Sequence, residues 1–175
     1  MNTATRILLT AVMCTAAVAC TKRVRELPPT DPGPSTGTGT GTVTDTRPTA
    51  PGMYGPGDLD TDACLRQRIV YFDLDQDALR PEFQAAMACH AKYLRDRPSS
   101  RLNLEGHADE RGSREYNLGL GERRGNSVSS ALQANGGSGG QITVNSFGEE
   151  RPTCTASNES CWAQNRRVEI IYTAR

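Results

Sequence analysis

Residues 101–132 read RLNLEGHADERGSREYNLGLGERRGNSVSSAL and hold a strand pattern, a charged loop and a helix pattern in direct succession. Leu102 and Leu104 alternate with polar residues, as in a strand that buries one face. A helix pattern begins near Ser113, and its apolar stripe consists of Tyr116, Leu120, Val128, Ala131 and Leu132. Glycines at 119, 121 and 125 are poor helix formers, so the first half of this helix needs support from packing.

Further strand and helix patterns lie on both sides of this stretch. Residues 69–72 form a β-rich run, and the alternating runs 142–146 and 168–172 predict two further strands. Another helix pattern starts at Pro81, which suits a first helical turn, and ends before Pro98. The predicted order is βαβαβ, then a loop or short helix, then a last strand. We expect an α/β fold of the α+β sandwich kind, in which a mixed four-stranded sheet carries the helices on one face.

The first 19 residues have the features of a secretory signal peptide. Arg6 supplies a positive start, residues 7–18 are mostly apolar, and small residues lead to Cys20. The apolar run is too short to span a bilayer. A cysteine at this position resembles the bacterial lipobox, in which the thiol is acylated, except that Ala17 replaces the usual leucine. The resemblance implies a lipid on Cys20, and Thr21 favours the outer membrane; the alternative is an ordinary cleaved signal and a chance cysteine.

Residues 20–57, which start with Cys20, have the composition of a linker. Proline, threonine and glycine dominate, and residues 36–42 read TGTGTGT. Almost nothing apolar can offset the entropy of ordering, so we expect a disordered tether. A Gly-rich coil of this length has a root-mean-square span of roughly 35 Å. The remaining residues, 58–175, contain all the strand and helix patterns described above and form the predicted domain.

The overall charge argues against a nucleic-acid binder. The chain has 20 Lys and Arg residues and 20 Asp and Glu residues, so its formal net charge is zero. Proteins that bind nucleic acids usually show a basic excess or a basic stripe, and this sequence has neither.

Four cysteines lie in the predicted domain, and a secreted chain enters a compartment that favours disulfides. Cys154 and Cys161 are seven residues apart in one loop, which favours a disulfide between them. Cys64, before the first strand, is then left to pair with Cys89 on the first helix. Buried free thiols are the alternative. A zinc site would normally show paired Cys-x2-Cys knuckles, which the sequence lacks.

The loop after the central strand pattern is dense in titratable groups. Five of them stand close together there: Glu105, His107, Asp109, Glu110 and Arg111. A loop at the end of a rigid strand is a good place to present polar groups, although composition alone also fits a solvated charged turn. A metal site on His107, Asp109 and Glu110 would need a spaced ligand set, and nucleophilic catalysis would need a Ser-His or Cys-His arrangement. The sequence shows neither pattern.

Four motifs, in their order and spacing, resemble the OmpA-like peptidoglycan-binding domain family. They are VYFDLD at 70–75, EGHADERG at 105–112, YNLGLGERRGN at 116–126 and NRRV at 165–168. Together with the lipobox and the linker, the arrangement is most similar to the lipid-anchored branch of that family that works with the Tol proteins.

The resemblance implies non-covalent binding to the diaminopimelate residue of the peptidoglycan stem peptide. In this family Asp109 would receive the ligand's ammonium and Arg124 its carboxylate. The other positions that match the family's pocket are Leu74, Asp75, Arg111, Asn117, Leu120 and Arg166. The free end of meso-diaminopimelate carries both charges on one carbon, which suits an anion beside the planar fork of an arginine. A loop like that of Cys154 and Cys161 occurs in some OmpA-like domains, and it does not affect the prediction of binding.

The resemblance also implies a cellular role. The chain would tether the outer membrane to the wall, with its domain in the periplasm and a TolB-like protein as partner, and would serve envelope integrity and cell division. It would need no cofactor and have no enzymatic activity. The alternatives are a wall-anchoring lipoprotein of a secretion or motility complex and a wall-modifying enzyme. The sequence departs from the family at Asp73, where glycine is common, and at Gly125, where alanine is usual.

Overall fold

A four-stranded mixed sheet forms the centre of the structure, a computed structural model that describes residues 52–175. Its strands are β1 (Ile69–Tyr71), β2 (Arg101–His107), β3 (Ile142–Gly148) and β4 (Arg167–Ala174). They lie in the order β1-β4-β2-β3, with β2 parallel to β3 and β4 antiparallel to both β1 and β2. The predicted mixed sheet is therefore confirmed. The predicted signal peptide, Cys20 and the linker up to residue 51 lie outside the described residues.

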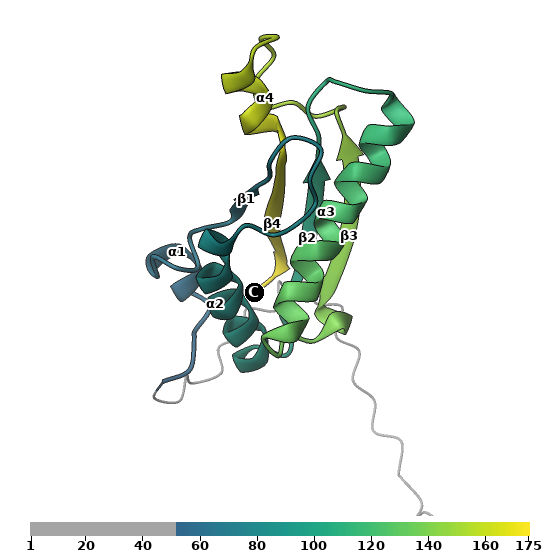
Figure 1. Cartoon of the computed structure of the whole chain (residues 1–175). Helices are drawn as coiled ribbons and strands as arrows, with labels where there is room; N and C mark the ends of the chain where they lie inside the picture. Colours follow the sequence, from purple (N-terminus) through teal and green to yellow (C-terminus); the bar gives the residue numbers. More distant parts are fainter. Residues whose placement is uncertain (1–51) are drawn as a thin grey trace, which may run out of the picture. The chain divides into compact units, whose positions relative to one another are not determined.

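Two helices, α2 (Gln84–Asp96) and α3 (Arg114–Ala134), cover one face of this sheet, as expected (Figure 1). A single turn, η1 (Pro81–Phe83), leads into α2. The core between helices and sheet consists of aliphatic and aromatic side chains that are almost fully buried, among them Val70, Phe72, Met87, Leu94, Leu102, Leu104, Val128, Leu132, Val168 and Ile170. Burying each of the larger ones contributes roughly 1.5–3 kcal/mol. The alternate strand residues, such as Asn103 and Ile171, stay partly or fully exposed on the other face.

Glycines allow α3 to lie directly on the sheet. A Cβ atom added to Gly106 of β2 would overlap the backbone carbonyl of Gly121, and one added to Gly125 would lie 2.5 Å from Cγ1 of Val144. The residues that weaken the helix by propensity thus permit the close approach that supports it. The hydroxyl of Ser113 caps α3 by accepting the backbone N–H of Tyr116 at 3.2 Å, so the helix begins where the sequence predicts.

The N-terminal part of the described chain packs on the outer side of α2. It contains α1 (Asp58–Thr61), and its Leu59 and Leu65 form a separate apolar cluster with Tyr93 of α2. A disulfide joins Cys64 to Cys89 of α2. This end of the molecule is therefore held by apolar burial and by one covalent link.

The last short helix, α4 (Glu159–Asn165), precedes β4, and a disulfide joins its Cys161 to Cys154 in the loop before it. Both disulfides are the pairs that the spacing predicts. A further single turn, η2 (Gly139–Gln141), follows the glycine-rich break after α3. None of the helices in residues 52–175 is both long and apolar enough to cross a membrane.

Candidate functional site

A pocket of about 360 Å³ opens at the end of the sheet where β2 passes into α3. It brings together seven of the eight predicted binding residues. The lining consists of Leu74, Asp75, Ala108, Asp109, Arg111, Gly112, Tyr116, Asn117, Leu120 and Arg124. The eighth predicted residue, Arg166, does not line the pocket but contacts Asp109, with its Nη1 3.3 Å from Oδ2.

Three segments build this pocket. The loop after β1 supplies Leu74 and Asp75, and the loop between β2 and α3 supplies Asp109 and Arg111. The first turns of α3 supply the rest, with Tyr116, Leu120 and Arg124 four residues apart and hence on one face of the helix. The helical period that the sequence displays therefore brings positions 116 to 124 to the same side.

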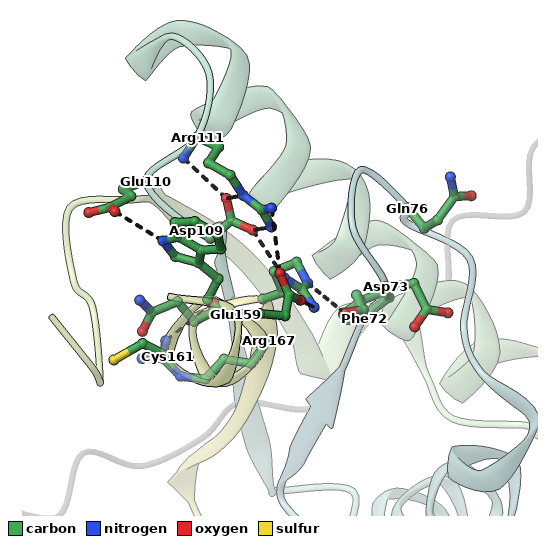
Figure 2. Close-up of polar contacts among 12 residues, drawn as sticks. Phe72, Asp73, Gln76, Asp109, Glu110, Arg111, Glu159, Cys161 and Arg167 are labelled. Atoms are coloured by element: carbon green, nitrogen blue, oxygen red, sulfur yellow. Dashed lines mark hydrogen bonds and ion pairs between the residues drawn. The ribbon is translucent and has the colours of Figure 1, made fainter. Parts of the chain in front are cut away.

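Asp109 is a buried carboxylate held by two arginines. Arg111 binds it in bidentate fashion, with Nε 3.0 Å from Oδ1 and Nη2 2.7 Å from Oδ2, and the Arg111 backbone N–H adds a bond of 3.1 Å to Oδ1. Figure 2 shows Arg111 folded over Asp109. Burial disfavours the charged form, but the hydrogen bonds from Arg111 and Arg166 outweigh it, so the pKa of Asp109 lies below its ordinary value. The carboxylate is therefore an anion at neutral pH.

Arg124 lies fully buried at the base of the pocket. Its guanidinium donates to three backbone carbonyls: Nε to Gln76 at 2.8 Å, Nη1 to His107 at 2.8 Å and Nη2 to Asp73 at 3.1 Å. Burial lowers the pKa of Arg124 to about 10, which leaves it charged at neutral pH. A guanidinium has five N–H groups, so one donor remains on each terminal nitrogen for a ligand. Arg124 thus joins the loop after β1 to the end of β2 as well as lining the pocket.

Tyr116 is the main pocket residue that the sequence pattern did not identify. The helical period placed it on the apolar stripe of α3, whereas its side chain is 46% exposed and its hydroxyl binds the Asp75 carboxylate. That hydrogen bond raises the pKa of Tyr116. Asp75 has a φ of 58°, in the left-handed region that few non-glycine residues adopt. Neither the bond nor the backbone conformation follows from helical spacing.

The segment closed by the Cys154–Cys161 disulfide contacts two of the residues around the pocket, which its sequence did not indicate. Trp162 of α4 follows Cys161, and the Arg111 guanidinium lies 4.2 Å from the centre of its ring. Glu159 of α4 lies 2.8 Å from Nη2 of Arg166 and 3.5 Å from Nη1 of Arg111. Figure 2 shows Glu159 beside Asp109 and Arg111, with Cys161 farther away on α4. Both arginines that hold Asp109 are therefore also in contact with α4.

The positions of His107, Asp109 and Glu110 do not support a metal site. Within residues 52–175, no three His, Cys, Asp or Glu side chains lie close enough together to hold a metal ion. His107 is buried and stacks on Phe147, with ring centres 5.7 Å apart. Burial lowers the pKa of His107 to about 4, so its ring is neutral at physiological pH.

Comparison with known proteins finds close similarity over the described domain. Residues 71–166 match the OmpA family. The peptidoglycan-associated lipoprotein of Pseudomonas aeruginosa is 47% identical over 115 residues, which cover 65% of this chain and 68% of that protein. The one from Legionella pneumophila is 42% identical over 119 residues and covers 68% of each chain. The crystal structure of the peptidoglycan-associated lipoprotein from Burkholderia pseudomallei superimposes with a TM-score of 0.65 at 38% identity, over 66% of this chain and 98% of that one.

Proposed function

We propose that this chain, which belongs to the OmpA family and within it to the peptidoglycan-associated lipoproteins, binds peptidoglycan non-covalently through the diaminopimelate of the stem peptide. The observation that carries the proposal is the pairing of a buried anion, Asp109, with a buried cation, Arg124, in one pocket. A free amino-acid end carries an ammonium and a carboxylate on one carbon. The pocket offers a partner for each of these groups.

The chemistry of the two groups assigns their subsites. The ligand's carboxylate lies against the two free Nη donors of Arg124, since a guanidinium presents parallel N–H groups to a carboxylate. The ligand's ammonium lies against Asp109. In the free pocket the Asp109 oxygens already accept four N–H groups from Arg111 and Arg166, which fills their lone-pair positions. The ammonium therefore takes the place of an Arg111 side-chain donor.

The remaining pocket residues select the rest of the ligand. Leu74 and Leu120 offer apolar surface for the methylene groups of diaminopimelate. Asp75 adds a carboxylate to the pocket lining, where it binds the Tyr116 hydroxyl, and Asn117 holds the loop by donating to the backbone carbonyl of Asp109 at 3.1 Å. The affinity of one such site is modest, because the ligand's ammonium and carboxylate are well hydrated before they bind. Many sites on one wall then give avidity.

The cellular role that we propose joins this site to the N-terminal sequence. A lipid on Cys20 anchors the chain in the outer membrane, and the linker that follows acts as a tether that lets the domain reach the wall from the periplasmic side. The end of the predicted linker belongs to the domain, because the Tyr54 backbone N–H donates to Asp96 at 2.8 Å and the Tyr54 ring packs against Tyr93. We infer a binding role rather than an enzymatic one, because the matched relatives are named for their association with peptidoglycan. By the same family relation we assign the chain to the Tol-Pal system, with a TolB-like partner.

A sedimentation assay with purified cell walls tests the proposal. The full chain, kept in detergent, should pellet with walls that contain diaminopimelate, and Asp109→Asn should remain in the supernatant. A matched control is Asp60→Asn, because Asp60 pairs with Arg68 and Arg175 at the far end of the domain and should not affect pelleting. Equal pelleting of Asp109→Asn and the unmodified chain would contradict the proposed site. Failure to recover a periplasmic Tol protein with the chain would leave the wall-binding site intact but would contradict the assignment to that system.

A further inference from the structure

Trp162 contacts both residues that follow Asp109. Its indole Nε1 donates to Oε1 of Glu110 at 3.0 Å, and its ring lies 4.2 Å from the guanidinium carbon of Arg111. A cation over an indole face is an attractive arrangement. Trp162 does not line the pocket, so any effect that it has on a ligand acts through these two neighbours.

Arg111 therefore has two sets of partners at once. One is the Asp109 carboxylate in the pocket, and the other is α4, which offers the Trp162 ring and the Glu159 carboxylate at 3.5 Å. The Arg111 side chain is 32% exposed, whereas Arg166 on the other side of Asp109 is 8% exposed and also bonds to the backbone carbonyl of Phe72. Of these two arginines, Arg111 is the one that is free to move when a ligand enters.

The disulfide loop fixes the place of α4. Cys161 is buried and bonded to Cys154, and the Asn165 side chain accepts from the backbone N–H groups of Thr153 and Cys154 at 2.8 and 3.1 Å. The loop also touches the pocket segment, because hydrogen bonds from Ser157 and Trp162 lower the pKa of Glu110. The position of the Trp162 ring thus depends on the Cys154–Cys161 link.

We propose that Trp162 is a positioning residue that retains the Arg111 guanidinium when the ligand's ammonium displaces it from Asp109, and that the Cys154–Cys161 disulfide holds Trp162 in place for this purpose. The inference rests on the proposed function. Without the Trp162 ring, Arg111 keeps only Glu159 of its two partners on α4 and competes more strongly with the ligand for Asp109. Ligand affinity then falls although every residue that lines the pocket is unchanged.

Calorimetric titration of the full chain with a soluble disaccharide-tetrapeptide that contains meso-diaminopimelate tests this role. Trp162→Ala should weaken binding about threefold to tenfold, the range expected for one cation–ring contact. Trp162→Phe keeps an aromatic face and should restore most of the affinity. In an Arg111→Met background Trp162→Ala should have no further effect, because the residue acts only through Arg111.

The two disulfides provide a matched control. Cys154→Ser with Cys161→Ser should weaken binding as Trp162→Ala does, whereas Cys64→Ser with Cys89→Ser, at the other end of the domain, should leave the affinity unchanged. Trp162 is the only tryptophan in the chain, so its fluorescence should change when the muropeptide displaces Arg111 from Asp109 and the guanidinium shifts over the Trp162 ring. Circular dichroism of each variant checks that the domain is folded.

The possible failures are distinguishable. An unmodified chain that binds no muropeptide contradicts the proposed function. An unmodified chain that binds, together with a folded Trp162→Ala variant of equal affinity, contradicts the positioning role alone. A loss of affinity that Trp162→Ala also causes in the Arg111→Met background would equally overturn it, because the effect would not pass through Arg111.

Discussion

The two ends of the sheet are built in opposite ways. At the end covered by α1, Leu59, Leu65 and Tyr93 are completely buried and make an apolar cluster, and the Cys64–Cys89 disulfide closes it. At the pocket end the buried groups are ionised: Asp109 and Arg124 are 4% and 0% exposed. Apolar burial stabilises by itself, whereas a buried charge is tolerated only with its hydrogen bonds complete. The first end stabilises the domain, and the second places an anion and a cation at the pocket where we propose that the ligand binds.

The two histidines of the chain are both buried but differ in their hydrogen bonds. His90 has both ring nitrogens in hydrogen bonds, Nδ1 with the Tyr172 hydroxyl at 3.0 Å and Nε2 with the Gln67 carbonyl at 3.1 Å. Since a carbonyl only accepts, Nε2 carries the proton and Nδ1 accepts from Tyr172. His107, beside the pocket loop, has no hydrogen-bond partner for either ring nitrogen among residues 52–175.

Removing the Arg124 guanidinium gives the largest expected effect. Arg124→Met should lower the free energy of unfolding by about 3–5 kcal/mol, because it removes the buried guanidinium that donates to three backbone carbonyls. Urea denaturation measures the change. Arg124→Lys keeps the charge but not the fork, so it should recover only part of the loss. An Arg124→Lys variant as stable as the unmodified chain would show that a positive charge at this position stabilises the domain without the guanidinium's hydrogen bonds.

Opening the distal disulfide separates stability from binding. The Cys64–Cys89 link spans 25 residues, so Cys64→Ser with Cys89→Ser should cost about 3 kcal/mol of stability by the chain-entropy model. Wall sedimentation below the denaturation midpoint should be unaffected. Reduced sedimentation by a folded variant would contradict the division between the two ends.

Mild acid should destabilise the domain through both histidines. Burial lowers the pKa of His90 and of His107 from 6.5 to about 4, so between these values the unfolded chain binds more protons than the folded one. The stability from the neutral rings is complete above pH 6.5 and falls as the pH drops towards 4. At pH 5 each histidine should account for about 2 kcal/mol of the loss. Denaturant midpoints at pH 7 and pH 5 measure it, and His107→Gln should show a smaller drop. An unchanged midpoint would contradict the burial of these rings as neutral groups.

Much of the fold could be predicted because its signals are local. Alternation of Leu102 and Leu104 marks β2, Ser113 marks the start of α3, and the spacing of four cysteines gives both disulfides. The glycines of α3 correctly predict that the first half of this helix needs support from packing. Their partners, Gly106 and Val144, lie on other strands, and local periodicity does not say which residues face one another across the sheet.

The site was less predictable, since its details depend on contacts between distant segments. The family resemblance predicts which residues line the pocket, but not their burial or their hydrogen-bond partners. Arg124 is bonded to three carbonyls rather than open to solvent. Asp73, where glycine is common in the family, contributes its carbonyl to Arg124, and its carboxylate lies 3.9 Å from Arg80. Trp162 is separated from Arg111 by 50 residues of sequence, and no spacing rule connects them.

We expect the pocket to bind both charged groups on the terminal carbon of diaminopimelate. Calorimetry can compare two muropeptides, one with meso-diaminopimelate and one with lysine, which differs at that end only by lacking the carboxylate. The lysine peptide should bind at least about tenfold more weakly, because a charge-assisted bond to Arg124 is lost. Asp109→Asn should weaken the binding of both peptides. Equal affinity of the unmodified chain for the two peptides would contradict this expectation.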